Sequence, residues 1–259
     1  MKNEIRRPKT GDRRQSLPLF SLSPFLLFSF SPLSFLHSHL FYLLLALALL
    51  LPRIPVVGRF FTIINTALHE FGHAVIALLL EGKVHKIELF GNSAGTATTQ
   101  SKSKLGSFLV AIAGYPFAST MAYFSFYLIA HQYNTHLIIG LSTLFLVMLF
   151  FWVRNSFGII WTLLFVALNI GLIYLQKPQW IAIAALFYAT VIFTESFLST
   201  LILLYHAIRN PGNSGDAANL KKLTHLPAFI WALLFAGYAG WVVYRIYVDF
   251  YLTGSIPYV

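Results

Sequence analysis

The chain has 259 residues, of which 58% are hydrophobic and only 10% are charged. Soluble globular domains carry about 25% charged residues, so this composition excludes a soluble protein with an ordinary surface. Cysteine is absent, which excludes disulfide frameworks, thiolate metal sites and cysteine nucleophiles. The net charge of +10 fits Lys and Arg gathered in cytoplasmic loops better than nucleic-acid binding, for which the sequence carries no motif.

The first 33 residues differ in composition from the rest of the chain. Six Lys and Arg residues lie within positions 1–16, and a stretch rich in Ser, Pro, Leu and Phe follows. A secretory signal peptide shares the basic start, but this apolar stretch is long, is broken by prolines and shows no small-residue cleavage site. We therefore expect residues 1–33 to form a disordered or interfacial tail and residues 34–259 to form a single transmembrane domain.

Apolar segments follow the tail at 34–51, 60–80, 105–130, 135–153, 156–175, 180–207 and 226–248. Runs of about 18 or more apolar residues are typical of transmembrane helices, and these runs lack the alternation of membrane β-barrel strands. The sequence predicts an all-α polytopic membrane protein with about six to seven transmembrane helices. Between the second and third segments, residues 83–101 combine apolar residues, a Gly91-Asn92 turn and a run of threonines, which predicts a small β-hairpin.

Lys and Arg are distributed unevenly over the loops. With the N-terminus placed in the cytoplasm, the cytoplasmic segments hold 14 of the 18 cations. The remaining cations on the outer side are Arg53, Arg59, Lys177 and Arg245. Cytoplasmic loops carry an excess of Lys and Arg, so this asymmetry predicts a cytoplasmic N-terminus. The 83–101 loop and the loop after the sixth apolar segment then lie on the cytoplasmic side.

His69-Glu70-Phe71-Gly72-His73 spells H-E-x-x-H within the second apolar segment. Residues four apart share one helix face, so both imidazoles can reach one cation, and Glu70 beside it can act as general base on a metal-bound water. With nine His and five Glu in the chain, only about 0.006 such matches are expected by chance. Imidazole suits zinc, and catalytic zinc sites keep one position open, so the motif predicts a Zn2+ site with Glu70 catalytic.

A catalytic zinc takes a third protein ligand, and the chain offers only eight carboxylates. Asp216 lies in a turn-rich stretch after the sixth apolar segment, on the same predicted membrane face as His73. An Asp in such a place also has an ordinary role, because it stabilises the first turn of a helix. Glu195 is the alternative carboxylate, and His206 and His225 are alternative nitrogen ligands. From the residues alone, the third ligand stays open among these four.

At these positions the chain resembles the site-2 protease family of intramembrane zinc metalloproteases, in its short branch without a large inserted domain. The resemblance covers about residues 55–230, and its motifs lie in the expected order. They are His69-Glu70-Phe71-Gly72-His73-Ala74, Gly82, Gly114-Tyr115-Pro116, Arg154-Asn155 with Gly158, and Gly215-Asp216-Ala217 with Leu220, Thr224 and Pro227. The better-known members carry Leu-Asp-Gly at the third ligand, where this chain has Gly215-Asp216-Ala217.

The resemblance implies zinc held by His69, His73 and Asp216. It implies an enzyme that hydrolyses peptide bonds of membrane-bound protein substrates, with residues 34–259 as one transmembrane metalloprotease domain. The expected partners are these substrates and the lipid bilayer, with no nucleic acid. An extended substrate segment would pair with the hairpin by strand addition.

Two other function classes fit parts of the pattern. A catalytically silent membrane scaffold would bind metal without hydrolysis, but it would have no need of Glu70. An ion- or proton-coupled transporter would use Glu195 and the membrane histidines, but no internal symmetry with paired broken helices is apparent. In the favoured protease, a donor such as Asn210, Asn213 or His225 would help to hold the oxyanion.

Overall fold

The computed structural model describes residues 32–50 and 54–254. Most of the tail predicted over residues 1–33 lies outside the described residues. The elements are α1 (Pro32–Leu50), α2 (Val57–Leu79), β1 (Lys83–Leu89), β2 (Gly95–Gln100), α3 (Lys104–Ala130), α4 (Asn134–Phe151), α5 (Ser156–Tyr174), α6 (Pro178–Arg209), α7 (Gly215–Thr224), α8 (Ala228–Ile246) and a π-helical turn, Tyr247–Tyr251.

The predicted fold class is confirmed. Six of the described helices, α2 to α6 and α8, are long and apolar enough to cross a membrane, and the predicted hairpin is present as β1 and β2. Within α1, the described apolar stretch Leu40–Leu50 is shorter. The boundaries of the six helices differ from the predicted segments by no more than three residues, because apolar runs report the length of a transmembrane helix directly.

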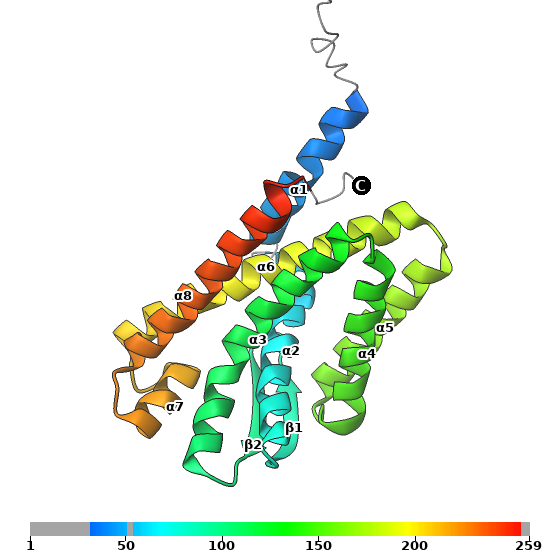
Figure 1. Ribbon diagram of the computed structural model, residues 1–259. Coiled ribbons are helices and arrows are strands. Elements are labelled where there is room, and N and C mark those ends of the chain that lie inside the picture. The colour runs from blue at the N-terminus through cyan, green and yellow to red at the C-terminus, as the bar shows by residue number, and fades with distance from the viewer. Residues whose placement is uncertain (1–31, 51–53, 255–259) are drawn as a thin grey trace, which may run out of the picture.

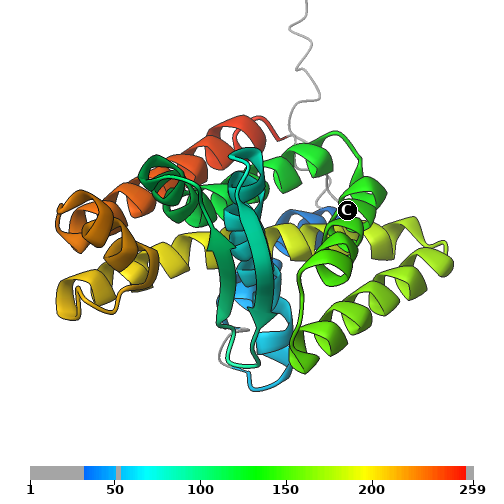
Figure 2. The same cartoon turned by 90° about the horizontal axis from the view of Figure 1, so that it is seen from below.

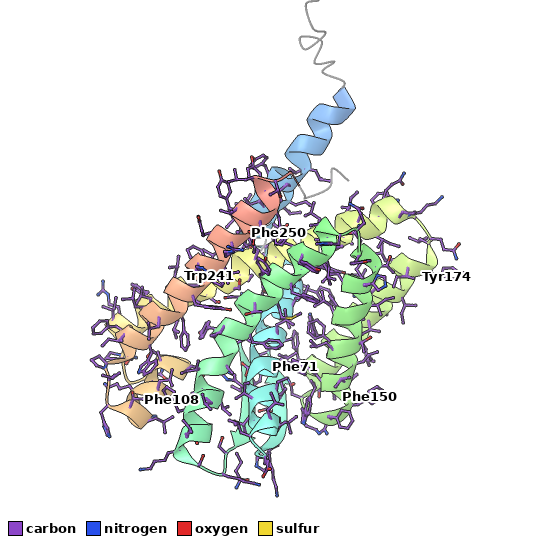
Figure 3. All side chains as sticks on the ribbon, in the orientation of Figure 1. Phe71, Phe108, Phe150, Tyr174, Trp241 and Phe250 are labelled. Carbon is purple, nitrogen blue, oxygen red and sulfur yellow. The ribbon has the colours of Figure 1, made fainter. Side chains whose placement is uncertain are left out.

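Large hydrophobic side chains cover the outside of the helical assembly. Phe150 and Tyr174 are 74% and 84% exposed, and both lie at the periphery in Figure 3. Trp241 on α8 is 55% exposed. So much apolar surface would promote aggregation in water, whereas lipid covers it in a bilayer. Together with the six apolar helices, this surface identifies an integral membrane protein.

Helix α2 lies at the centre and is the most deeply buried of the six membrane-crossing helices. It packs against α3, α6 and both strands (Figure 1). Seen from below, the hairpin lies over α2, with α3 on one side and the α4–α5 pair on the other (Figure 2). Residues of α2 are therefore surrounded by protein rather than by lipid.

The two edges of the hairpin have different surroundings. The outer edge of β1 is covered by the segment between α4 and α5, where the Ile87 N–H donates to Trp152 O at 2.8 Å and the Arg154 N–H donates to Ile87 O at 3.2 Å. Asn155 continues this pairing, because its carboxamide accepts from the Leu89 N–H at 3.1 Å and donates to Leu89 O at 2.5 Å. Among the described residues, no strand pairs with the outer edge of β2.

Hydroxyl groups on α2 hold the tip of the hairpin. The Thr66 hydroxyl donates to Ser93 O at 2.9 Å, and the Thr62 and Ser93 hydroxyls are 2.7 Å apart. Irregular backbone is tolerated at membrane depth only where protein or water satisfies its polar groups. These contacts satisfy part of the turn and keep β2 alongside α2.

Local signals explain how the helices around the hairpin start and stop. The Ser103 hydroxyl caps α3 by accepting from the Gly106 N–H at 3.0 Å. Helix α7 ends at His225, which has a left-handed backbone with φ of 63°. The Thr224 hydroxyl accepts from the Trp231 indole N–H at 3.1 Å, so the corner between α7 and α8 is held by a side chain.

Candidate metal centre

Two imidazoles and one carboxylate converge between α2 and α7. His69 and His73 lie one turn apart on α2, and their Nε2 atoms are 3.1 Å apart. Asp216, in the first turn of α7, places Oδ2 at 3.2 Å from each Nε2. Among the described residues, these three form the group of possible metal ligands, with ligand atoms that all lie within 4.8 Å of one another.

The orientation of the His73 ring follows from its second nitrogen. Nδ1 lies 2.7 Å from the backbone oxygen of Val110 on α3. A carbonyl oxygen only accepts, so Nδ1 carries the proton and donates it. In the neutral ring, Nε2 then holds the lone pair and points at the Asp216 carboxylate. This is the outer-shell contact that orients a metal-binding imidazole.

Helix α3 approaches the imidazoles at a residue without a side chain. A Cβ added to Gly114 would collide first with Cε1 of His69 and would lie 2.6 Å from Nε2 of His73, so no other residue fits here without displacing both rings. The neighbouring Tyr115 ring packs edge-to-face on His69, with ring centroids 4.5 Å apart. The Gly114-Tyr115-Pro116 motif thus leaves room for both imidazoles at Gly114 and packs the Tyr115 ring against His69.

The charge state of Asp216 is set by its neighbours. Burial alone would raise the pKa of this carboxyl, but His73 and His69 together hold the pKa of Asp216 well below its usual range. Its place in the first turn of α7 also favours the negative form. Asp216 is therefore a carboxylate at neutral pH, as a metal ligand must be.

Glu70 is buried, with 6% of its surface exposed, and lies against the hairpin. A Cβ added to Gly95 of β2 would lie 3.0 Å from Oε1 of Glu70, so the missing side chain makes room for the carboxylate. The main chain of Ala97 on β2 lies close to the Glu70 carboxylate. The acid of the motif is thus held between its own helix and β2.

A cavity of about 710 Å³ connects these groups. Its wall includes residues of α2, β2, α3, α6 and α7. Most of the side chains that α2, β2 and α7 contribute are polar. It extends from Asn65 in the first half of α2 to Lys222 on α7, which is exposed. The polar lining from Thr66, Thr99 and their neighbours suits a water-filled space inside a bilayer.

The other candidates for the third ligand lie elsewhere. Glu195 does not line this cavity. His206 is exposed in the last turn of α6, and His225 lines a separate cavity beside Lys221. Asp216 is therefore the one of the four candidates that the structure brings to the imidazoles.

The residues expected to donate to the oxyanion also lie outside this cavity. Asn210 and Asn213 do not line the cavity that holds Glu70, and neither does His225. Asn219, Tyr115 and Lys222 line it instead. The sequence carried one usable signal for Asn219, since helical spacing puts a residue three positions after Asp216 near its side of α7.

The Gly114→Ala variant tests whether the gap in α3 holds the imidazoles. We expect it to bind Zn2+ about tenfold more weakly or worse, because the added methyl group displaces the rings of His69 and His73. Zinc affinity of the purified protein is measured by competition with a chelating dye. Gly171→Ala is the matched control, since a Cβ there meets nothing within 4 Å. Equal zinc affinity in the two variants would contradict this account.

The comparisons with known proteins agree with the geometry. A family profile described as Peptidase M50B-like matches residues 40–245, which is most of the chain. No curated protein and no solved structure shows a match. The matched region contains α2 to α7 and so all of the residues around the cavity. The resemblance to the site-2 proteases is thereby confirmed, and the chain belongs to the Peptidase M50B-like family.

Proposed function

We propose that the chain is an intramembrane zinc metalloprotease that hydrolyses peptide bonds of membrane-bound protein substrates. One observation carries the proposal: His69, His73 and Asp216 converge beside Glu70 in a polar cavity of an integral membrane protein. Membership of a peptidase family supports it. A scaffold or a transporter would require no acid held next to two imidazoles.

The donor set fits zinc. Two imidazole nitrogens and one carboxylate oxygen match the ligands of catalytic zinc sites, and His69, His73 and Asp216 would hold the ion. The His73–Val110 hydrogen bond gives the outer-shell support that such ligands usually have. When bound, zinc supplies Lewis-acid polarisation of the scissile carbonyl and lowers the pKa of water towards about 7.

Glu70 is the proposed general base. Its carboxylate takes the proton from the attacking water and passes it to the leaving amine. Glu70 is buried between α2 and β2, so the acid keeps its position while it gains and loses the proton. The attacking water would occupy the cavity that Glu70, His69 and His73 line together.

The open edge of β2 is the proposed binding site for an extended substrate segment. Ile87 and Ala97 are opposite each other in the hairpin, and Ile87 directs its main-chain groups away from β2. When one residue of an antiparallel pair points its main-chain N–H and C=O away from the partner strand, the residue opposite it does the same on its own strand. The N–H and C=O of Ala97 therefore face the open edge of β2. Those of Thr99 face the same edge, because the direction alternates along a strand. Both residues line the cavity beside Glu70, so a strand added there would pass the proposed base.

The site is proposed to open on the cytoplasmic side. In Figure 1 the described start of α1 lies at the opposite end of the molecule from the hairpin, so the structure does not support the predicted placement of the N-terminus on that same side. The hairpin ends at Lys83 and Lys102, and α7 carries Lys221 and Lys222. Figure 1 shows the hairpin and α7 at the same end of the molecule. Cations concentrate on the cytoplasmic side of membrane proteins, which supports this orientation.

The Glu70→Gln variant tests the proposed chemistry. We expect it to keep bound zinc but to lose cleavage by about a thousandfold or more, because the amide cannot accept the proton. His69→Ala should lose both zinc and cleavage. The assay measures cleavage of a panel of tagged single-span membrane proteins, reconstituted with the enzyme in vesicles. Metal analysis measures the zinc bound to each variant.

Glu88→Gln is the matched control, because it makes the same change in a carboxylate that pairs with Lys86 away from the cavity. It should cleave like the wild type. If Glu70→Gln cleaves as well as Glu88→Gln, or if the wild type cleaves no member of the panel, the proposed function is wrong.

The Thr99→Pro variant tests strand addition. Proline removes the N–H that faces the open edge of β2 and leaves the pairing with β1 in place, so loss of about 1 kcal/mol should lower kcat/KM five- to tenfold. Thr99→Ala keeps the N–H and should cleave like the wild type. Equal kcat/KM for the two variants would show that the substrate does not pair with this edge.

Sidedness is tested by single cysteines, for which the wild-type chain gives no background because it has none. We expect Lys177→Cys, between α5 and α6, to react with a membrane-impermeant maleimide added outside intact cells. Lys102→Cys, beside the hairpin, should react only after permeabilisation. The reverse labelling pattern would overturn the cytoplasmic placement.

A further inference from the structure

The inner end of the cavity contains a polar side chain without a partner. Asn65 lies on α2 one turn before His69, so the two share a helix face. The residue is only 6% exposed, and its Oδ1 has no hydrogen-bond partner among the described residues. It lines the same cavity as His69 and Glu70.

Burial of an unpaired carboxamide destabilises a protein, whereas Leu at the same position would fill the space without that penalty. Buried polar groups are nearly always paired, so an unpaired one suggests a partner that binds during function. The other described side-chain atoms of this kind belong to Ser119, Asn134 and Ser214, and none of these residues lines the cavity. Asn65 is thus the member of this group that lines the cavity, with its Oδ1 enclosed behind the cavity wall.

The chemistry of the proposed substrate suggests that partner. The inference rests on the proposed function: a transmembrane helix must unwind locally before its peptide bond can be cut. Unwinding creates a new helix end inside the bilayer, where up to four N–H or C=O groups lose their partners. The extended part can pair with β2, but the groups at the new helix end point along the helix axis and cannot.

Asn65 lies where that helix end would be. The hairpin tip contacts α2 through Thr62 and Thr66, so β2 starts beside Asn65 and runs towards the end of α2. Asn65 is about 6 Å along the helix from His69, on the side away from the exposed mouth of the cavity near Lys222. A substrate strand on β2 would therefore return to helix near the depth of Asn65.

We propose that Asn65 caps the broken end of the substrate helix and so binds the unwound state of the substrate. A carboxamide carries both donors and an acceptor, and rotation of the Asn65 side chain would turn the enclosed Oδ1 towards the cavity, so it can satisfy a free C=O or a free N–H. The same residue therefore serves substrates whose helices run in either direction across the membrane. Asn is also among the most effective helix-capping residues in proteins generally.

The experiment compares two probes cleaved by the wild type. One is a reconstituted single-span protein from the panel, and the other is a peptide of about eight residues that contains only its cleavage site. For Asn65→Leu and Asn65→Ala, we expect kcat/KM to fall about tenfold on the single-span protein and to stay within about twofold on the peptide, which has no helix end to cap. Zinc content and Tm should not fall, and Asn65→Gln should recover part of the activity.

Ser119→Ala is the matched control, because it removes another buried, unpaired polar atom outside the cavity. It should cleave both probes like the wild type. Unchanged cleavage by both Asn65→Leu and Asn65→Ala would overturn the proposal, and so would an equal loss on both probes or a loss of zinc. Such results would leave the proposed function intact, since that depends on Glu70→Gln.

Discussion

The approach of one carboxylate to two imidazoles inside an apolar helical protein is the contact on which the arrangement depends. Ionisable groups at membrane depth are costly unless they pair with one another, with a cation or with water. His69, His73 and Asp216 meet that requirement together, at 3.1–3.2 Å. The bare surface of α3 at Gly114 and the carbonyl of Val110 act on the same cluster, because they fix where the imidazoles can lie.

The hairpin brings polar main-chain groups to membrane depth, and its two edges satisfy these groups in different ways. One edge is closed by the chain between α4 and α5 and by the carboxamide of Asn155, so its main-chain groups are satisfied permanently. The other edge faces the cavity, where Ala97 and Glu70 both line the wall. A rigid strand fixed on one side and open on the other suits a surface that must accept different extended segments, since main-chain pairing does not depend on side-chain identity.

Much of the fold could be predicted because its signals are local. Apolar runs predicted the transmembrane helices, and the Gly91-Asn92 turn predicted the hairpin. The four-residue spacing of the histidines likewise put them on one helix face. Asp216 could not be separated from Glu195 in this way, because spacing says nothing about residues far apart in the chain. The folded helices bring the first to the imidazoles and leave the second outside the cavity. The roles of Asn155 and Asn65 were missed for the same reason: an Asn in a sequence does not show whether it pairs with a strand or stays unpaired.

The two parts of the ligand cluster are made at very different times. His69 and His73 belong to the second helix, whereas Asp216 follows α6 near the end of the chain. Chains emerge from the ribosome at about 5–20 residues per second, so several seconds separate the two parts during synthesis. The incomplete chain therefore lacks the full cluster while its first helices enter the membrane. In the proposed protease, this order would delay assembly of the site until most of the chain has been made.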